Sequence, residues 1–444
     1  MDRLDGEVLW QRIQAFPPAP VYWVAYSGGC DSHALLHAMA ELRPRLGGEL
    51  RAIHVNHGLQ SVAADWVAHC RGVCAALDVA LTVVSVSVEP APGESLEAAA
   101  RDARYDAFAR ELGEGDCLLL AHHLDDQAET LLLRLLRGAG VHGLAAMPVC
   151  RPLGRGYLLR PLLSTPRAAI VDYARAHGLR WVDDPSNEQS QFDRNFLRNQ
   201  LIPRAAERWP SVSRTLARAA AQAAEAADLL DELAQADCDA CSIGPDLDAA
   251  RLSALSAARQ RNLLRYWIRR RGLSVPPRER LISGLDALLA AGPDRQPLLV
   301  WGAGRVRRHR GRLVLEAHAE SALPSASAWD LCAPVAWAGG WVEAVDTVGG
   351  GIRADLAGRH DLRLLPRRGG ERLRLPGRAH GSALKKLLQE RGVPPWERAR
   401  LPLLYVGDEL AAVADLFVDA AFAARPGEPG LRLVWRRPGP AGEP

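Results

Sequence analysis

Lysine is almost absent from this sequence of 444 residues. Its only two lysines, Lys385 and Lys386, are adjacent, and all other basic residues among the 55 are arginines. The sequence also has no run of about 18 apolar residues, which excludes an ordinary membrane-spanning helix. Its first residues show no basic segment followed by an apolar one. No secretory signal is therefore expected, and we expect a cytoplasmic protein.

Paired cysteines are also scarce. Eight cysteines are spread along the chain, and only Cys70/Cys74 and Cys238/Cys241 lie close together. The second pair has the CxxC spacing, but no further ligand pair lies nearby at the spacing that a zinc site needs. Reduced thiols are therefore expected. The net charge of +3 is a small difference between 55 basic and 52 acidic residues, so the distribution of arginine is more informative than the total.

The first 150 residues alternate between short apolar runs and helical patterns. Continuous apolar strands separated by helices predict an α/β fold with a parallel sheet covered on both faces. Each of the four runs ends in polar or Gly-rich residues, at the edge of the sheet where ligands bind in such folds. The predicted strands are 21–26, 51–55, 81–86 and 117–121, and the predicted helices between them are 32–45, 63–77 and 95–112.

The segment Ser27-Gly28-Gly29-Cys30-Asp31-Ser32 joins the first predicted strand to the first predicted helix. Two glycines allow a tight turn that brings backbone N–H groups against an anion, and the helix adds its positive end. The serine hydroxyls can donate to phosphate oxygens, and Asp31 can hold a cation bound to them. An ordinary glycine turn with an N-capping side chain is the alternative. Neither a Walker loop nor a GxGxxG motif is present.

A second cluster, His122-His123-Leu124-Asp125-Asp126-Gln127-Ala128-Glu129-Thr130, follows the fourth strand and opens a helix. Its carboxylates can be plain capping acids, but His123, Asp126 and Thr130 share one helix face directed at the same sheet edge as Ser27. Arg137-Gly138-Ala139-Gly140 follows. In this segment an arginine precedes glycines, whose backbone can adopt conformations that other residues avoid. Arg101 and His57 are weaker candidates: a solvated helix face and an ordinary loop histidine are nearly as well supported.

These motifs resemble those of a known family. Ser27–Ser32 resembles the SGGxDS loop of the PP-loop ATPases, and the two later segments resemble the HHxxDQxET and RGxGxxGL motifs of tRNA(Ile)-lysidine synthetases and their 2-thiocytidine relatives. Asp183–Asn187, with Arg194 and Arg198, is similar to a further lysidine-synthetase block. Residues 381–398 resemble the C-terminal domain of the longer bacterial members. The iron–sulfur cysteines of the 2-thiocytidine enzymes have no counterpart in the catalytic half.

The resemblance implies a C–N ligase reaction in two steps. The O2 atom of the wobble cytidine in a tRNA(Ile) with a CAU anticodon attacks the α-phosphate of ATP, and pyrophosphate leaves. The ε-amino group of free L-lysine then displaces AMP to give lysidine, which changes decoding from AUG to AUA. ATP is a substrate, and Mg²⁺ is the expected cofactor. A 2-thiocytidine-type modifier or a small-molecule amide synthetase is the alternative, and no membrane partner is expected.

The resemblance also implies an architecture and a set of site residues. We expect a Rossmann-like PP-loop (HUP-type) domain over 1–210, a mainly helical tRNA-binding domain over 211–320, a linker over 322–334, and an α+β tRNA-binding domain over 335–436. The sequence leaves open the oligomeric state (a homodimer included), the carboxylate that faces lysine, the rejection of other CAU-bearing tRNAs and the role of Cys238/Cys241. The expected residues are Asp31, Arg101, His123 and Asp126 for catalysis; Ser27, Gly28, Gly29, Cys30, Asp31, Ser32, Asn56, His57, Arg137 and Gly138 for ATP; Asp125, Asp126 and Glu129 for lysine; Arg194, Arg198, Arg307, Arg308, Lys385 and Lys386 for tRNA; and Asp31 for Mg²⁺.

Overall fold

The computed structural model divides the chain into two compact units, one up to Leu230 and one from Asp231 on. The helix α10 (Val212–Cys241) contains this boundary, which agrees with the domain-bridging helix expected over 213–240. The structure describes residues 3–56, 63–90, 95–182, 193–292, 295, 297–317, 324–359 and 361–436.

A six-stranded sheet forms the centre of the first unit, in the order β3-β2-β1-β4-β6-β5. All neighbouring strands are parallel except β5 and β6, which form an antiparallel pair. The parallel sheet expected from the four apolar runs is confirmed, and the hairpin β5–β6 extends it. The strands are β1 (Val21–Ala25), β2 (Glu49–Asn56), β3 (Ala80–Ser85), β4 (Cys117–Leu119), β5 (Cys150–Leu153) and β6 (Gly156–Leu159).

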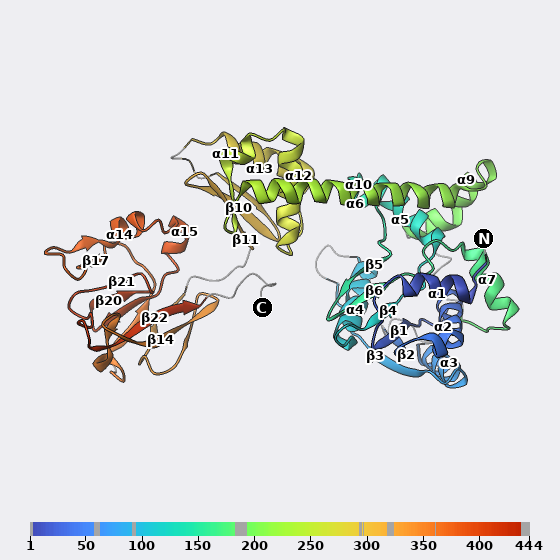
Figure 1. Ribbon diagram of the computed structural model, residues 1–444, viewed down its shortest axis with the longest axis horizontal. Coiled ribbons are helices and arrows are strands. Elements are labelled where there is room, and N and C mark those ends of the chain that lie inside the picture. The colour runs from blue at the N-terminus through green and yellow to red at the C-terminus, as the bar shows by residue number, and fades with distance from the viewer. Residues whose placement is uncertain are drawn as a thin grey trace. The chain divides into compact units, whose positions relative to one another are not determined.

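Helices cover both faces of this sheet, which explains why its strands read as continuous apolar runs. On β1, Tyr22 and Val24 contribute to one core, and Trp23 between them contributes to the other. The first core also receives side chains of α1, α2, α3 and α7, whereas α4 packs in the second. Figure 1 shows these helices around the strands of the sheet. The helices of this unit are α1 (Gly6–Gln14), α2 (Cys30–Leu42), η1 (Arg43–Arg45), α3 (Ala63–Ala76), α4 (Leu96–Glu111), α5 (Leu124–Leu136), α6 (Val141–Leu144), α7 (Arg167–Ala176), α8 (Asp193–Phe196), the π-helical η3 (Leu197–Leu201) and α9 (Ile202–Arg208).

The second unit begins with helices packed on an antiparallel sheet in the order β7-β8-β11-β10-β9. The hairpin predicted within 301–315 is present as β10–β11, and the neighbouring strands make the sheet wider than the sequence indicated. Its elements are β7 (Ser242–Ile243), β8 (Asp246–Asp248), α11 (Ala249–Ser253), α12 (Ala257–Arg270), α13 (Arg278–Ala290), β9 (Leu298–Trp301), β10 (Gly304–His309) and β11 (Arg312–Ala317).

The rest of the second unit is an α+β fold built on two antiparallel sheets, β12-β16-β19-β20-β21 and β13-β14-β22-β15. The prediction of a linker up to residue 334 is wrong from Ser327 on: β12 pairs with β16, and Trp329 and Leu331 are buried in the core. Small residues and prolines around these two apolar side chains concealed them in the sequence. The elements are β12 (Ser327–Ala328), β13 (Val335–Trp337), β14 (Gly340–Val348), β15 (Ile352–Arg353), η4 (Ala354–Leu356), β16 (Leu362–Leu365), β17 (Arg372–Leu373), β18 (Ser382–Ala383), α14 (Leu384–Glu390), α15 (Pro395–Arg398), β19 (Leu403–Val406), β20 (Glu409–Val413), β21 (Phe417–Val418) and β22 (Pro429–Arg436).

None of the described helices combines the length and the apolar character that a bilayer span needs.

Candidate active site

The glycine-rich loop lies between β1 and α2, beside β4, at the point where the strand order changes direction. Parallel α/β sheets bind ligands at such a switch point. The hydroxyl groups of Ser27 and Ser32 lie 3.0 Å apart, and the Ser27 backbone N–H donates to Ser32 Oγ at 3.2 Å. Gly29 is the N-cap of α2 and has no side chain to cap the first turn. The loop therefore presents hydroxyls and helix N–H groups together, which is the arrangement that binds phosphate.

Gly28 has a backbone conformation that requires glycine. Its φ is +88°, and a Cβ atom there would lie 3.3 Å from Cys70 Sγ. The Gly28 carbonyl also accepts a hydrogen bond from the N–H of Val182 at 3.0 Å, so the chain after α7 returns to the loop. A side chain at this position would strain the backbone and press on α3.

Asp31 lies in the first turn of α2 and faces two basic side chains from other elements. Its Oδ2 is 3.7 Å from His123 Nε2, and its Oδ1 is 3.8 Å from Arg167 Nε. Among the described residues, Oδ1 is buried without a hydrogen-bond partner. The loop after β1 and the segment after β4 therefore meet, as expected for motifs at one sheet edge. The catalytic roles of Asp31 and His123 stay predictions.

His123 is held by its own helix. It caps α5: its Nδ1 accepts from the N–H of Asp126 at 3.3 Å, and its own N–H donates to Asp126 Oδ2 at 3.0 Å. This arrangement places the imidazole proton on Nε2, which faces the carboxylates of Asp31 and Asp126 at 3.7 and 3.3 Å. Burial lowers the pKa of His123, but the surrounding carboxylates, Asp31 first, outweigh burial and raise the pKa above its ordinary value.

Asp126 and Glu129 form a buried ionic cluster with Arg194 and Arg198. Glu129 accepts from Arg198 Nε at 2.7 Å and Arg194 Nε at 2.8 Å, and Asp126 Oδ1 accepts from the Nη2 atoms of both arginines at 2.9 and 3.0 Å. Burial would raise the pKa of Asp126, but His123 and Arg194 foremost lower it to about 2. Asp126 and Glu129, two of the three predicted lysine-binding acids, thus lie together with two of the predicted tRNA-binding arginines.

Asp125 has a different environment from its neighbours. Its Oδ2 accepts from the backbone N–H of Arg167 at 2.8 Å and so caps α7. Its side chain is 32% exposed, whereas that of Asp126 is 10% exposed, so Asp125 is the more accessible carboxylate of the pair.

A cationic cluster lies beside these acids, around the Tyr105 ring. Arg160 is buried and donates to His122 Nδ1 at 3.2 Å, to the Pro148 carbonyl at 2.7 Å and to the Tyr105 hydroxyl at 3.5 Å. The Arg101 guanidinium lies 5.6 Å from the centre of the Tyr105 ring. Burial, assisted by neighbouring arginines, lowers the pKa of His122 to about 3, so this imidazole stays neutral beside the cations.

The sequence missed Arg160 and Arg167. Neither residue belongs to a recognisable sequence motif. Both lie near the site only because the chain after β4 folds back toward the sheet edge. The Arg167 guanidinium reaches Asp31 because α7 starts next to the first turn of α5, a placement that sequence spacing does not encode.

The structure does not bring Arg137 and Gly138 to the loop. They follow the C-terminal end of α5, about 20 Å along the helix axis from His123, and Arg137 pairs with Asp193 at 2.8 Å. Asn56 is the last residue of β2, next to β1 at the expected sheet edge. His57 and Asp183–Asn187 lie outside the described residues.

The remaining predicted tRNA-binding residues belong to the second unit. Lys385 and Lys386 are exposed on α14, whose buried side carries leucines. Arg308 donates to the carbonyls of Leu288, Leu289 and Ala291 and so caps the end of α13. Arg307 pairs with Glu316 at 3.1 Å and lies 5.0 Å from the centre of the Trp396 ring. The two lysines are therefore the more accessible cations of this group. The assignments of Arg307, Arg308 and both lysines to tRNA stay predictions.

Three family models match successive parts of the chain. A PP-loop domain model covers residues 9–205, a TilS substrate binding domain model covers 247–314, and a TilS substrate C-terminal domain model covers 362–435. The first covers the sheet and the loop, and the other two lie in the second unit.

Relatives of this chain are similar along nearly their whole length. A tRNA(Ile)-lysidine synthase of Alkalilimnicola ehrlichii is 47% identical over 441 residues, which are 99% of this chain and 98% of the relative. Proteins of the same name from Pseudomonas putida and Pseudomonas aeruginosa are 47% and 45% identical, covering 90% and 97% of this chain and 93% and 96% of the relatives.

Proposed function

The chain belongs to the tRNA(Ile)-lysidine synthase family and is a ligase that modifies tRNA to form lysidine, and we propose which of its residues act in each of the two steps of this reaction. The alternatives of a 2-thiocytidine-type modifier and a small-molecule amide synthetase are not favoured. The observation that supports the proposal most strongly is the meeting of Asp31 with His123 beside the phosphate-binding loop.

In the activation step, the loop would bind the leaving pyrophosphate. The cytidine O2 forms a bond to the α-phosphate, and the bond from that phosphorus to the β-phosphate oxygen breaks. Negative charge grows on the departing group, and the Ser27 and Ser32 hydroxyls and the N–H groups in the first turn of α2 would donate hydrogen bonds to it. These donors are fixed before ATP arrives, so little reorganisation is needed during the reaction.

The residues around Asp31 fit the Mg²⁺ ion expected with ATP. Mg²⁺ prefers oxygen ligands, and Asp31 Oδ1 is a buried carboxylate oxygen without a hydrogen-bond partner among the described residues. Asp31 would hold the ion, whose charge would offset that of the phosphate oxygens. The Arg167 guanidinium, 3.8 Å from the same oxygen, limits the negative charge at this point.

The cationic cluster would receive the adenylated cytidine. Arg101 and Arg160 supply fixed positive charge around Tyr105, and the His122 imidazole stays neutral there. We assign to Arg101 the stabilisation of negative charge on the α-phosphate and on the departing AMP.

In the second step, free lysine would bind at the acidic cluster. Asp126 and Glu129 are already paired with Arg194 and Arg198, so an incoming ammonium group would compete with guanidinium groups for the same oxygens. The displaced arginines would then be free to contact tRNA phosphate. Asp125 is accessible and is the third carboxylate of this group. One of the three carboxylates would act as the base that deprotonates lysine.

Mass spectrometry of the modified nucleoside tests this proposal. A tRNA transcript with a CAU anticodon is incubated with the protein, ATP, Mg²⁺ and lysine, and digested to nucleosides. We expect one cytidine to gain lysine with loss of water, and Asp31→Ala to abolish the product while keeping the thermal transition of the wild type. Product formation by Asp31→Ala at a near-normal rate would remove Asp31 from the reaction.

A further inference from the structure

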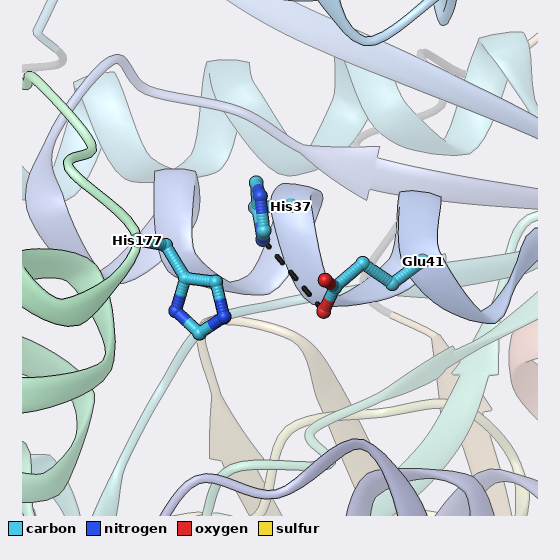
Figure 2. A group of neighbouring side chains, drawn as sticks. All are labelled: His37, Glu41 and His177. Atoms are coloured by element: carbon cyan, nitrogen blue, oxygen red, sulfur yellow. Dashed lines mark ion pairs between the residues drawn. The ribbon is translucent and has the colours of Figure 1, made fainter.

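We propose that His37, Glu41 and His177 form a binding site for a divalent transition-metal ion of the Zn²⁺ type, separate from the phosphate-binding loop. His37 and Glu41 are one turn apart on α2, and His177 follows the last residue of α7, which packs on α2. Figure 2 shows the three side chains gathered on one side of α2.

The ligand atoms are already close to one another. One nitrogen of each histidine and one carboxylate oxygen all lie within 4.8 Å of one another. The side chains of His37 and Glu41 approach each other to 3.9 Å, and the two imidazole rings have centroids 4.9 Å apart. Ligands bound to one ion at about 2 Å lie somewhat closer than this. Binding of an ion would therefore require small rotations of the exposed Glu41 and His177 side chains.

Tyr173 orients this cluster. His177 Nδ1 lies 2.9 Å from the Tyr173 carbonyl oxygen and donates to it, which leaves the His177 Nε2 lone pair free. His37 Nδ1 lies 2.9 Å from the Tyr173 hydroxyl, which donates to Glu41 Oε2 at 2.9 Å. Metal-binding histidines characteristically donate their second ring N–H to such a partner, which fixes the tautomer and the ring orientation.

The cluster is open to an ion from solvent. His37 is partly buried against Tyr173, and its side chain remains in contact with solvent. The Glu41 side chain is 55% exposed and His177 is exposed, so an ion can enter directly from water. Water can then complete the coordination.

The donor set selects the class of ion. Two imidazoles and one carboxylate suit Zn²⁺, Co²⁺ or Ni²⁺, whereas Mg²⁺ prefers six oxygen ligands and keeps its waters. The site is therefore distinct in chemistry from the position proposed for Mg²⁺ at Asp31. It is also distinct in place, since His37 is six residues along α2 from Asp31, about 9 Å.

Metal binding here would fasten α7 to α2. Both helices carry residues of the active site in their first turns, Asp31 on α2 and Arg167 on α7. An ion that joins them would stabilise the folded first unit in proportion to its occupancy. The alternative is that these side chains form a hydrogen-bonded network and bind no ion.

Titration calorimetry with Zn²⁺ on the full-length, chelator-treated protein tests the proposal. We expect saturable binding, accompanied by a rise in the thermal transition and unaffected by millimolar Mg²⁺. His177→Ala should weaken this binding at least tenfold, and the matched exposed histidine variant His380→Ala should leave it unchanged.

Two further variants separate ligand loss from misfolding. Glu41→Gln changes an exposed carboxylate and should weaken Zn²⁺ binding without lowering the thermal transition of the metal-free protein. Tyr173→Phe keeps all three ligands but removes the hydroxyl, and we expect about a tenfold loss of affinity. Absence of saturable Zn²⁺ binding, or equal affinity in the wild type, His177→Ala and Glu41→Gln, would show a hydrogen-bonded network only and overturn the proposal.

Discussion

Glu129→Gln is the substitution that tests the buried ionic cluster. The Glu129 side chain is 2% exposed and accepts hydrogen bonds from Arg198 Nε at 2.7 Å, Arg194 Nε at 2.8 Å and Arg198 Nη2 at 2.9 Å. Glutamine has nearly the same shape, but it keeps one accepting oxygen and turns an NH₂ group toward a guanidinium. The substitution therefore removes one partner of a buried charge pair and leaves the other in place.

The size of the effect follows from these contacts. A hydrogen bond to a charged group contributes about 1.5–3 kcal/mol, and at least one is lost together with the negative charge. Arg194 and Arg198 retain Asp126 and are 27% exposed, so water compensates part of the loss. We expect the free energy of unfolding of the first unit to fall by about 3 kcal/mol, at the lower end for a broken buried pair.

Thermal unfolding monitored by circular dichroism measures this loss. For a unit of this size, about 3 kcal/mol corresponds to a transition lower by about 6–12 °C. Glu207→Gln is the matched control, because Glu207 pairs with Arg204 at 2.5 Å but is 62% exposed, and such pairs contribute about 0–1 kcal/mol. Equal transitions for the two variants would refute the cluster as a source of stability.

Three further predictions concern charge and backbone. His123 has a raised pKa, so its pairing with carboxylates stabilises the fold fully below pH 6.5, and this stabilisation is lost as pH rises through the raised value. His122 has a pKa lowered to about 3, so its burial destabilises the fold increasingly as pH falls below 6.5. Urea unfolding of His123→Asn and His122→Asn between pH 5 and 8 should thus change the pH dependence of stability in opposite directions, and changes of the same sign would contradict it. Charge reversal at Lys385 and Lys386 should weaken tRNA binding and leave ATP binding unchanged. The slope of the logarithm of the tRNA association constant against the logarithm of salt concentration should fall in magnitude by about 2, and an unaltered tRNA affinity across the salt series would exclude both lysines from the interface. Gly28→Ala places a Cβ at φ +88° and should cost about 1–2 kcal/mol of stability and weaken ATP binding, and wild-type ATP affinity would show that the loop does not bind phosphate.

The sequence predicted the layout of the first unit well because its strands and helices have clear periods. The apolar strands, the Ser27–Ser32 loop and the helix that opens after His123 are local features, and each depends on residues close in the chain. Their meeting at one sheet edge follows from the parallel topology.

Long-range pairings could not be predicted in the same way. Arg194 and Arg198 were expected to contact tRNA, and the structure pairs both with Asp126 and Glu129 on another helix. Nothing in their own segment indicates this partner. Arg308 likewise looked like part of a basic surface, but its guanidinium caps α13 through three carbonyls. An arginine on a strand cannot be assigned to a ligand or to a helix end from its spacing alone.

A crystal structure of the protein with a non-hydrolysable ATP analogue and Mg²⁺ would show whether the Ser27–Ser32 loop binds the phosphates. We expect the β- and γ-phosphates to lie against the Ser27 and Ser32 hydroxyls and the N–H groups at the start of α2, with Asp31 beside the metal. Electron density for the triphosphate at any other part of the sheet edge, with the loop in contact with solvent only, would contradict it.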